Sequence, residues 1–466
     1  MNLKQLKSQV RSGKIDTVIV ALPDPFGRLV GKRFRAEVFL DSVARKGTHA
    51  CNYLLTVNLE MDPLDGFKVA SWDKGFGDFT LQPDLETIRL VSWQEGAVLV
   101  ICDHVRHDGT LVAESPRSVL RRQLQRIKRK GLTCFCASEL EFYLFNQSYH
   151  AAFAGGYREL QPSSDYRIDY HVMQPTRDEP LMRAIRNGMT TADVPIESSK
   201  GEWSRGQHEI NFRYGRPLSM ADIHVFFKQG VREIADQHGK CISFMAKYAP
   251  SEAGNSCHIH MSLWKGGRNI FVKPKKQASG GRGRADVNRN NGLEGNGSKS
   301  FRQFLGGLLK YSPELCLFFA PTINSYKRYQ PGSWAPTRMA WAVDNRTVGF
   351  RVVGEGNAFR IENRMPGADA NPYLAFAAML AAGLAGMEQN LDCGSEYEGN
   401  AYVDPALARL PATLPEATDL FARSDLAREA FGPEVLDFYA HHARLEAAAF
   451  NNAVTDWEKV RYFERI

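Results

Sequence analysis

Alternating polar and apolar residues predict a strand at residues 136–145, which read C-A-S-E-L-E-F-Y-L-F. In an extended chain successive side chains point to opposite faces, so Glu139 and Glu141 share one face while Leu140 and Phe142 share the other. Two carboxylates about 7 Å apart on a half-buried face repel each other by roughly 2 kcal/mol at an effective dielectric near 20. A bound cation would remove that cost. The alternative is a solvated sheet face that happens to carry two acids.

Three later segments also place polar side chains on one face and apolar side chains on the other: Glu209 with Asn211, His258 with His260, and Arg360 with Glu362 and Arg364. One such strand is ordinary, but four indicate a curved antiparallel sheet that lines a single site. Carboxylate and imidazole groups bind divalent cations, and arginine forks match phosphate and carboxylate groups. The residue chemistry therefore predicts an enzyme that handles metal ions and phosphate.

The remaining patterns indicate an α+β chain. The segments 17–22 and 29–35 flank P-D-P-F-G and predict a hairpin inside a small unit that ends near residue 110. Helices are expected at about 36–45, 116–130, 179–189, 220–238 and 373–387, and a strand is expected at 345–351. Neither a G-x-x-x-x-G-K-[ST] motif nor the protein kinase motif set occurs, so neither common nucleotide-binding fold is supported.

Composition narrows the setting of the protein. The 466 residues are 43% hydrophobic and 24% charged, which is ordinary for a globular protein. Much of the net charge of +7 falls in a Gly/Asn-rich run at 273–299, which we expect to be a flexible surface insert and not a nucleic-acid platform, because it lacks interleaved aromatic residues. The eight cysteines show no paired spacing, and neither a signal peptide nor a membrane span is recognised. A cytoplasmic protein is expected.

Six motifs follow one another in the order seen in the glutamine synthetase family, and the chain resembles that family from about Gly77 to Gly386. They are E-L-E-F at 139–142, G-Q-H-E-I at 206–210, H-I-H-M-S at 258–262, N-S-Y-K-R at 324–328, N-R-T at 345–347 with the following Arg351, and R-I-E-N-R-M-P-G-A-D-A-N-P-Y at 360–373. The tail, with G-N-A-Y at 399–402 and V-T-D-W-E at 454–458, looks most like the γ-glutamylpolyamine synthetase branch.

This resemblance implies a β-grasp domain at residues 1–110 and, at 111–466, a catalytic domain whose curved antiparallel sheet is surrounded by helices. It also implies a double-ring dodecamer with active sites between neighbouring subunits. The reaction implied is an ATP-dependent ligation in which the glutamate γ-carboxylate attacks the γ-phosphate of ATP and an amine then displaces phosphate from γ-glutamyl phosphate. Two to three Mg²⁺ or Mn²⁺ ions per site would neutralise charge on the transferring group.

The resemblance also assigns roles to individual residues. Those similar to metal ligands are Glu141, Glu202 and Glu209 for a first ion, and Glu139, His258 and Glu362 for a second ion on the ATP phosphates. Those similar to contacts with glutamate are Gly254, Arg328 and Arg364, and those similar to nucleotide or phosphate contacts are His260, Ser262, Arg346, Arg351 and Arg360. Of these, Arg346, Glu362 and Arg328 are expected to act directly in catalysis.

Three departures from the family pattern concern the acceptor. Trp334 stands where ammonia-using members carry the glutamate of P-G-x-E-A-P, and the region near 51–55 lacks the aspartate of F-D-G-S-S. The segment 253–256 reads A-G-N-S where N-G-S-G is common. Loss of both acids disfavours ammonium, and Trp334 offers an apolar and cation–π wall. We therefore expect an organic amine, a polyamine or a monoamine, as acceptor.

Several alternatives remain open at this level. In one alternative, Trp334 only packs against a neighbouring subunit and another acid binds ammonium. The protein would then be a true ammonia-using glutamine synthetase. A catalytically silent structural member of the family is the third possibility, although buried acids without a function are costly.

Overall fold

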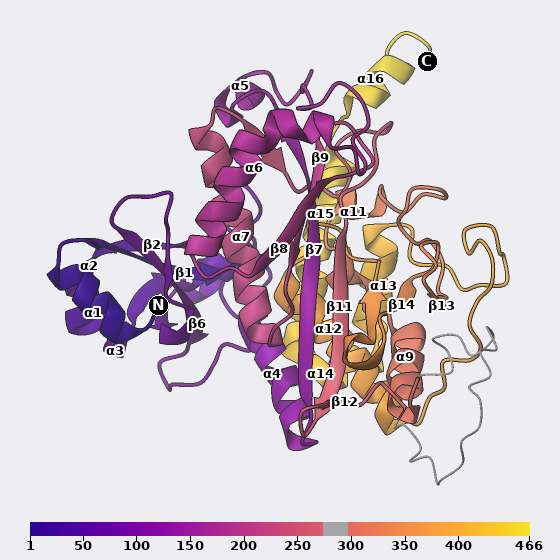
Figure 1. Cartoon of the computed structure of the whole chain (residues 1–466), viewed down its shortest axis with the longest axis horizontal. Coiled ribbons are helices and arrows are strands. Elements are labelled where there is room, and N and C mark those ends of the chain that lie inside the picture. Colours follow the sequence, from indigo (N-terminus) through magenta and orange to yellow (C-terminus); the bar gives the residue numbers. More distant parts are fainter. Residues whose placement is uncertain (274–296) are drawn as a thin grey trace, which may run out of the picture.

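The computed structural model describes residues 1–273 and 297–466, so nearly all of the predicted insert at 273–299 lies outside the described residues. The described chain forms two β-sheets with helices packed around them (Figure 1), which confirms the predicted α+β class. The strands are β1 (Thr17–Pro23), β2 (Leu29–Arg35), β3 (Thr48–Cys51), β4 (Asp78–Pro83), β5 (Arg89–Leu90), β6 (Ala97–Val105), β7 (Thr133–Phe145), β8 (Ile196–Gly201), β9 (Gln207–Phe212), β10 (Cys241–Ser243), β11 (Cys257–Lys265), β12 (Arg268–Asn269), β13 (Trp341–Val343), β14 (Phe350–Val353) and β15 (Arg360–Asn363).

The longer helices surround the second sheet, and short helical turns connect the strands of the first. The α-helices are α1 (Leu3–Arg11), α2 (Ala36–Val38), α3 (Ala44–Lys46), α4 (Pro116–Arg129), α5 (Tyr149–Ala154), α6 (Met173–Thr191), α7 (Pro217–Gln237), α9 (Lys299–Tyr311), α10 (Cys316–Phe319), α11 (Ile323–Tyr326), α12 (Pro372–Glu388), α13 (Leu414–Arg423), α14 (Asp425–Phe431), α15 (Pro433–Asn452) and α16 (Asp456–Tyr462). A π-helical turn, η1 (Phe39–Val43), joins α2 to α3, and 3₁₀ turns lie at η2 (Asn52–Leu55), η3 (Trp72–Lys74), η4 (Leu85–Thr87) and η5 (Gly356–Ala358).

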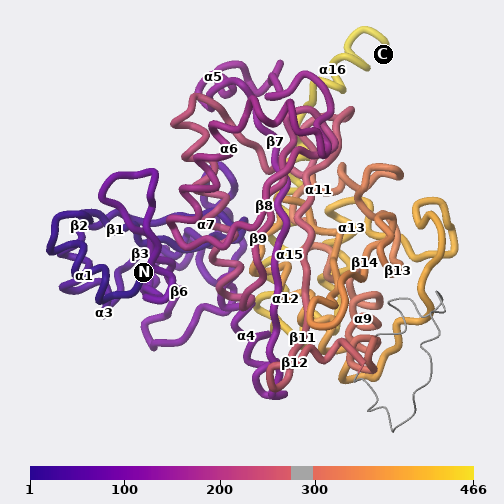
Figure 2. The backbone as a smooth tube through the Cα atoms, viewed as in Figure 1, coloured from indigo at the N-terminus to yellow at the C-terminus, as the bar shows by residue number. Residues whose placement is uncertain are grey.

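The first sheet has the strand order β2-β1-β6-β4-β3, with β5 also paired to β6. β1 and β2 form the expected hairpin, whereas β1 and β6 are parallel. Val18, Val20, Val98 and Val100 point into a core that Leu6 of α1 also enters. Figures 1 and 2 show this sheet at one side of the molecule, away from the C-terminal helix α16. The division of the chain near residue 110 stays a prediction.

The second sheet has the order β13-β14-β15-β11-β7-β9-β8, and β10 and β12 add to β7 and β11. Each neighbouring pair in the run β14-β15-β11-β7-β9-β8 is antiparallel, as expected. β13 and β14 are parallel, so the sheet is mixed. The apolar face of β7, with Leu140, Phe142 and Leu144, is buried and packs towards α7. The opposite face, which carries Glu139 and Glu141, is left free to line a cavity.

The helix α12 forms the centre of the layer behind the second sheet. Every residue from Pro372 to Gly386 is buried, and the helix packs against α4, α7 and α9. A helix that is apolar on all sides has no face for solvent, so complete burial follows from its sequence. Among the described residues, no helix combines the length and the apolar character that crossing a bilayer requires.

Two sequence predictions about elements need correction. Residues 345–349 form a loop and not a strand, because only Phe350 and Arg351 of the expected segment belong to β14. The helix predicted at 179–189 begins earlier, at Met173, and Pro180 lies inside it.

A buried arginine connects the first sheet to the helices behind the site. Arg117 of α4 donates to Asp103 of β6 at 2.6 Å, to Asp84 at 2.7 Å and to Asp222 of α7 at 2.9 Å. Its guanidinium is fully buried, so the three carboxylates offset the cost of removing its charge from water. This network holds α4 and α7 in fixed positions beneath β7.

Candidate active site

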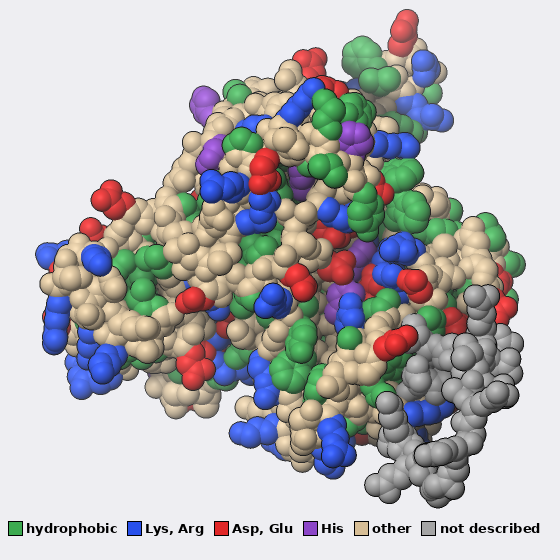
Figure 3. Space-filling model, viewed as in Figure 1, with side chains coloured by type: hydrophobic (Ala, Val, Ile, Leu, Met, Phe, Trp, Pro, Cys, Tyr) green, Lys and Arg blue, Asp and Glu red, His purple; other side chains and the backbone are tan. Residues whose placement is uncertain are grey.

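The second sheet carries a cavity of about 710 Å³ on its polar face. Figure 3 shows acidic and histidine side chains gathered in this hollow at the centre of the molecule, with basic side chains beside them. The predicted site residues that line it are Glu139, Glu141, Glu202, Glu209, Gly254, His258, Trp334, Arg346, Arg351, Glu362 and Arg364. Eleven of the predicted positions therefore converge on one cavity.

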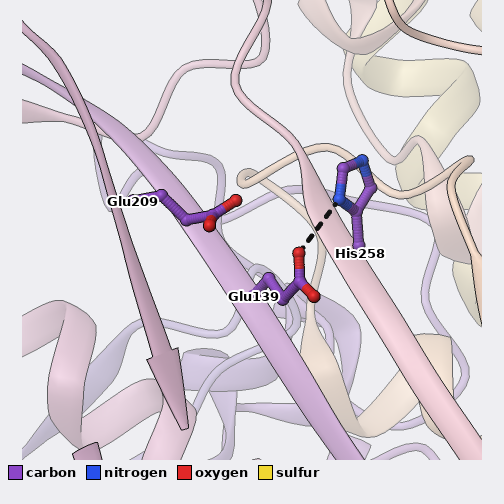
Figure 4. Close-up of side chains that lie close together, drawn as sticks. All are labelled: Glu139, Glu209 and His258. Carbon is purple, nitrogen blue, oxygen red and sulfur yellow. Dashed lines mark hydrogen bonds and ion pairs between the residues drawn. The ribbon is translucent and has the colours of Figure 1, made fainter. Parts of the chain in front are cut away.

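Strand register explains why these side chains meet. Glu141 of β7 pairs with Glu209 of β9, and Glu139 of β7 pairs with His258 of β11. On the other side, Glu362 of β15 lies between β11 and β14, opposite Arg351. Directly opposed residues on one sheet face have Cβ atoms about 5 Å apart. In Figure 4 the side chains of Glu139, Glu209 and His258, from three neighbouring strands, point towards one another.

A first group of carboxylates consists of Glu141, Glu202 and Glu209, each of which offers an oxygen within 4.8 Å of the others. Burial and the neighbouring Glu202 carboxylate raise the pKa of Glu141 to about 8, even though its Oε2 accepts a hydrogen bond from the Ser256 amide at 2.7 Å. Burial and the Glu139 carboxylate raise the pKa of Glu209 to about 9. Such crowded carboxylates fit a divalent cation, because a cation would offset both the burial and the repulsion.

A second group surrounds the imidazole of His258. Its Nδ1 lies 3.3 Å from Glu139 Oε2 and 3.6 Å from Glu362 Oε1, and its Nε2 is buried without a hydrogen-bond partner. Burial and the Arg364 guanidinium lower the pKa of His258 to about 4, so the imidazole is neutral near pH 7 and able to bind a metal. Glu209 also comes within 4.8 Å of Glu139 and His258, so Glu209 belongs to both groups. This donor set also fits a divalent cation.

Millimolar Mn²⁺ or Mg²⁺ is expected to raise the melting temperature of the chelator-treated protein by about 2–5 °C, since a ligand that binds only the folded state stabilises it. Differential scanning fluorimetry against NaCl of matched ionic strength measures this effect. An unchanged melting temperature would contradict the assignment of the two groups to metal ions.

Arginines surround the acidic groups. Glu362 Oε1 accepts from Arg364 at 2.5 Å and Oε2 accepts from Arg351 at 2.9 Å. Although burial works in the opposite direction, Arg364 and His258 hold the pKa of Glu362 at about 2. Arg346 lines the cavity from the loop that precedes β14. Glu362 is therefore ionised throughout the working pH range and orients two guanidinium groups towards the cavity.

Arg328, which was expected to contact substrate, lies behind the cavity wall. Its guanidinium is buried, and it donates to the carbonyl of Met365 at 2.8 Å and to Ser256 Oγ at 2.7 Å. Gly254 lies between Arg328 and the cavity, and a Cβ at that position would come within 2.5 Å of Arg328 Cγ. This geometry gives Arg328 a positioning role beneath residues 254–256, and its predicted role as a direct contact stays untested.

A second cavity of about 380 Å³ adjoins the first, and Glu139, Ser198 and Asn211 line both. Three of the predicted nucleotide contacts, His260, Ser262 and Arg360, lie in this second cavity. The aromatic residues Phe135, Tyr214 and Trp264 also line it. A polar end beside Glu139 and an aromatic end farther away suit a nucleotide, with phosphates near the acidic groups and the base among the rings.

His260 connects the two cavities. Its Nε2 lies 2.5 Å from Glu139 Oε1, and Arg360 Nε donates to its Nδ1 at 3.1 Å. Although burial raises the pKa of a carboxyl, His260 and His258 hold the pKa of Glu139 well below its ordinary value. Glu139 is therefore a fixed negative charge at the junction of the two cavities.

Several residues of the cavity wall were missed by the sequence reasoning. Lys200 forms ion pairs with Glu202 and, at 3.1 Å, with Asp169, and its ammonium lies 4.2 Å from the centre of the Tyr170 ring. Trp203 contacts Trp334, with ring centroids 5.6 Å apart. The signal for Lys200 and Trp203 was their position in K-G-E-W, on either side of Glu202, whereas Asp169 and Tyr170 fall in a loop-rich stretch without any periodic pattern.

Comparisons with known proteins agree with this site. Residues 113–462 match the family model described as glutamine synthetase, catalytic domain. The chain is 47% identical to a gamma-glutamylethanolamide synthetase of Streptomyces coelicolor, over all of this chain and 96% of the relative, and 36% identical to a glutamate–isopropylamine ligase of a Pseudomonas species, over all of this chain and 99% of the relative. A solved GmaS/ADP complex superimposes with a TM-score of 0.80 at 26% identity, covering 98% of this chain and 99% of that one. The chain belongs to the glutamine synthetase family.

Proposed function

We propose that this protein is an ATP-dependent ligase that joins the γ-carboxylate of glutamate to an organic amine. The observation that carries the proposal is the junction of two cavities at a cluster of acids, histidine and arginines, with two tryptophans in contact at the proposed acceptor wall. The relatives named as a gamma-glutamylethanolamide synthetase and a glutamate–isopropylamine ligase support an amine acceptor.

The chemistry proceeds in two balanced steps. A γ-carboxylate oxygen of glutamate attacks the γ-phosphorus of ATP, and ADP leaves. The neutral amine nitrogen then attacks the acyl carbon of γ-glutamyl phosphate, the C–O bond to phosphate breaks, and the amine loses a proton. Arg346, Arg351 and Arg364 would balance charge on the phosphate and carboxylate oxygens. Mg²⁺ or Mn²⁺ held by the two acidic groups would supply further positive charge to the phosphates.

Ammonia is the second candidate acceptor, because two acids remain at the edge of the cavity. Asp169 and Glu202 together bind a primary ammonium group, that of Lys200. An ammonium ion bound at these acids would compete with the ammonium group of Lys200, which favours an organic amine that enters uncharged beside the tryptophans. The intact set of metal-binding side chains argues against a catalytically silent protein.

Phosphate release from ATP with glutamate and Mg²⁺, measured across a panel of amines, tests the function. We expect kcat/KM for isopropylamine or ethanolamine to exceed that for ammonium at least about 10-fold, because an apolar wall contributes roughly 1.4 kcal/mol or more to the larger acceptor. Faster turnover with ammonium than with every organic amine would contradict the acceptor and leave the ligase standing. Absence of release with any amine would contradict both.

We also propose an oligomeric state and a cellular location for the enzyme. Family membership supports a double-ring dodecamer, and mass photometry measures the number of subunits. The eight cysteines show no paired spacing in the sequence, which supports a cytoplasmic enzyme that works on the cell's ATP and glutamate.

A further inference from the structure

A third cavity of about 690 Å³ lies against the tryptophan pair of the proposed acceptor wall. It is formed between residues 245–253 and residues 324–334, and it shares Trp203, Ala253 and Trp334 with the main cavity. An acceptor whose nitrogen reaches the acyl centre can therefore extend its other end past the indole rings into this space.

Both tryptophans contact arginine side chains. Trp334 has a left-handed backbone conformation with φ of 66°, which is costly for a bulky residue, and its carbonyl accepts from Arg364 Nη2 at 3.4 Å. The Arg167 guanidinium lies 4.5 Å from the ring centre of Trp203. Trp203 and Trp334 nevertheless remain 36% and 45% exposed. Large apolar rings in a cavity wall are suited to contact an aliphatic chain.

The charge of the third cavity is positive. Among the described residues that line it, the charged ones are Lys247, Lys327 and Glu252. The Glu252 carboxylate is occupied by Arg205, whose Nη2 lies 3.1 Å away. Lys327 is exposed, with its ammonium 5.4 Å from the ring centre of Phe450. The residues that line the space therefore carry two ammonium groups, of which that of Lys247 donates to the Glu252 carbonyl, and no unpaired carboxylate.

Resting on the proposed function, we infer that this cavity selects monoamines with an uncharged tail and rejects diamines and polyamines. A polyamine that places one nitrogen at the acyl centre must bring a second ammonium group towards Lys247 and Lys327, and like charges repel. A hydroxyl or alkyl tail meets no such repulsion. Gln330, which also lines the cavity, offers hydrogen bonds to a hydroxyl group.

Three acceptors of equal chain length test this inference: n-butylamine, 4-amino-1-butanol and 1,4-diaminobutane. With the full-length enzyme we expect kcat/KM for the diamine to be about 10-fold or more below that for the amino alcohol, as repulsion at an effective dielectric near 20 requires. In the double variant Lys247→Gln/Lys327→Gln, we expect the two kcat/KM values to differ by no more than about 3-fold. Lys4→Gln/Lys128→Gln, which removes two exposed lysines from α1 and α4, is the matched control and should keep the wild-type gap.

The salt dependence of the wild-type enzyme gives a second readout that needs no folded variant. Raising NaCl from about 0.05 to 0.5 M screens charges and should narrow the gap between diamine and amino alcohol. The inference would be overturned if the diamine were used as well as or better than the amino alcohol. It would also be overturned if neither salt nor the double substitution changed the ratio of their kcat/KM values. Either result would leave the proposed function standing. If the enzyme released no phosphate with any of the three amines, nor with isopropylamine or ethanolamine, the proposed function would be overturned as well.

Discussion

Glu209→Gln is expected to lower kcat/KM roughly 1,000-fold or more while raising the melting temperature of the metal-free protein by about 2–5 °C. The carboxylate belongs to both groups of metal-binding side chains, so its loss weakens both. In the absence of metal the same carboxylate is buried beside Glu139, Glu202 and Glu141, and a neutral amide relieves that repulsion. Phosphate release and thermal unfolding in the presence of a chelator measure the two effects.

The pH dependence of the melting temperature tests the predicted stabilisation by Glu209→Gln independently of activity. The pKa of Glu209 is about 9 in the folded protein against an ordinary 4.5, so the folded state binds its proton more tightly than the unfolded state does. The stability from this group is fully present below pH 4.5 and is lost as the pH rises towards 9. The advantage of Glu209→Gln over wild type should therefore grow between pH 6 and pH 8.5, whereas exposed Glu86→Gln should show no such trend. A variant that is less stable than wild type at every pH would contradict this account.

Glu362→Ala is expected to lower kcat/KM by a similar factor, roughly 1,000-fold or more, and also to destabilise the protein by about 3–5 kcal/mol. The substitution leaves Arg364 buried and Arg351 half-buried without the carboxylate that holds them. It also removes the group 3.6 Å from His258 Nδ1. Phosphate release and urea unfolding measure the two losses.

A conservative change separates the two consequences of losing Glu362. Glu362→Gln keeps the shape and one oxygen that accepts a hydrogen bond from an arginine, so it should recover much of the stability. It should recover little of the activity, because a cation requires the negative charge. Near-normal turnover in either variant would mean that Glu362 does not serve the transferring phosphate. Full recovery of activity in Glu362→Gln would assign the residue a purely structural role.

The alternation of side chains along β7, β9, β11 and β15 could be read from the sequence, and so could the chemistry of each polar face. The pairing of Glu141 with Glu209, and of Glu139 with His258, could not, because register depends on contacts between strands that are far apart in the chain. For the same reason the membership of Glu209 in both acidic groups became visible only in three dimensions.

Loops and helix starts were the least predictable parts. Residues 345–349 look extended but lie in a turn between two parallel strands, and the helix expected from residue 179 begins at Met173. Trp203 and Lys200 carry no periodic signal, and their importance comes from contacts with Trp334, Asp169 and Glu202. The placement of Arg328 behind Gly254 likewise depends on packing, which the motif alone does not specify.

A competition between ammonium and an organic amine in one tube tests most directly which of them is the acceptor. The enzyme receives ATP, glutamate and Mg²⁺ with equal concentrations of ammonium and ethanolamine or isopropylamine, and mass spectrometry measures the γ-glutamyl amide and glutamine formed. We expect the γ-glutamyl amide to dominate and ADP and phosphate to accumulate in equal amount. Glutamine as the main product would contradict an organic amine as acceptor, and absence of both products would contradict a glutamate ligase.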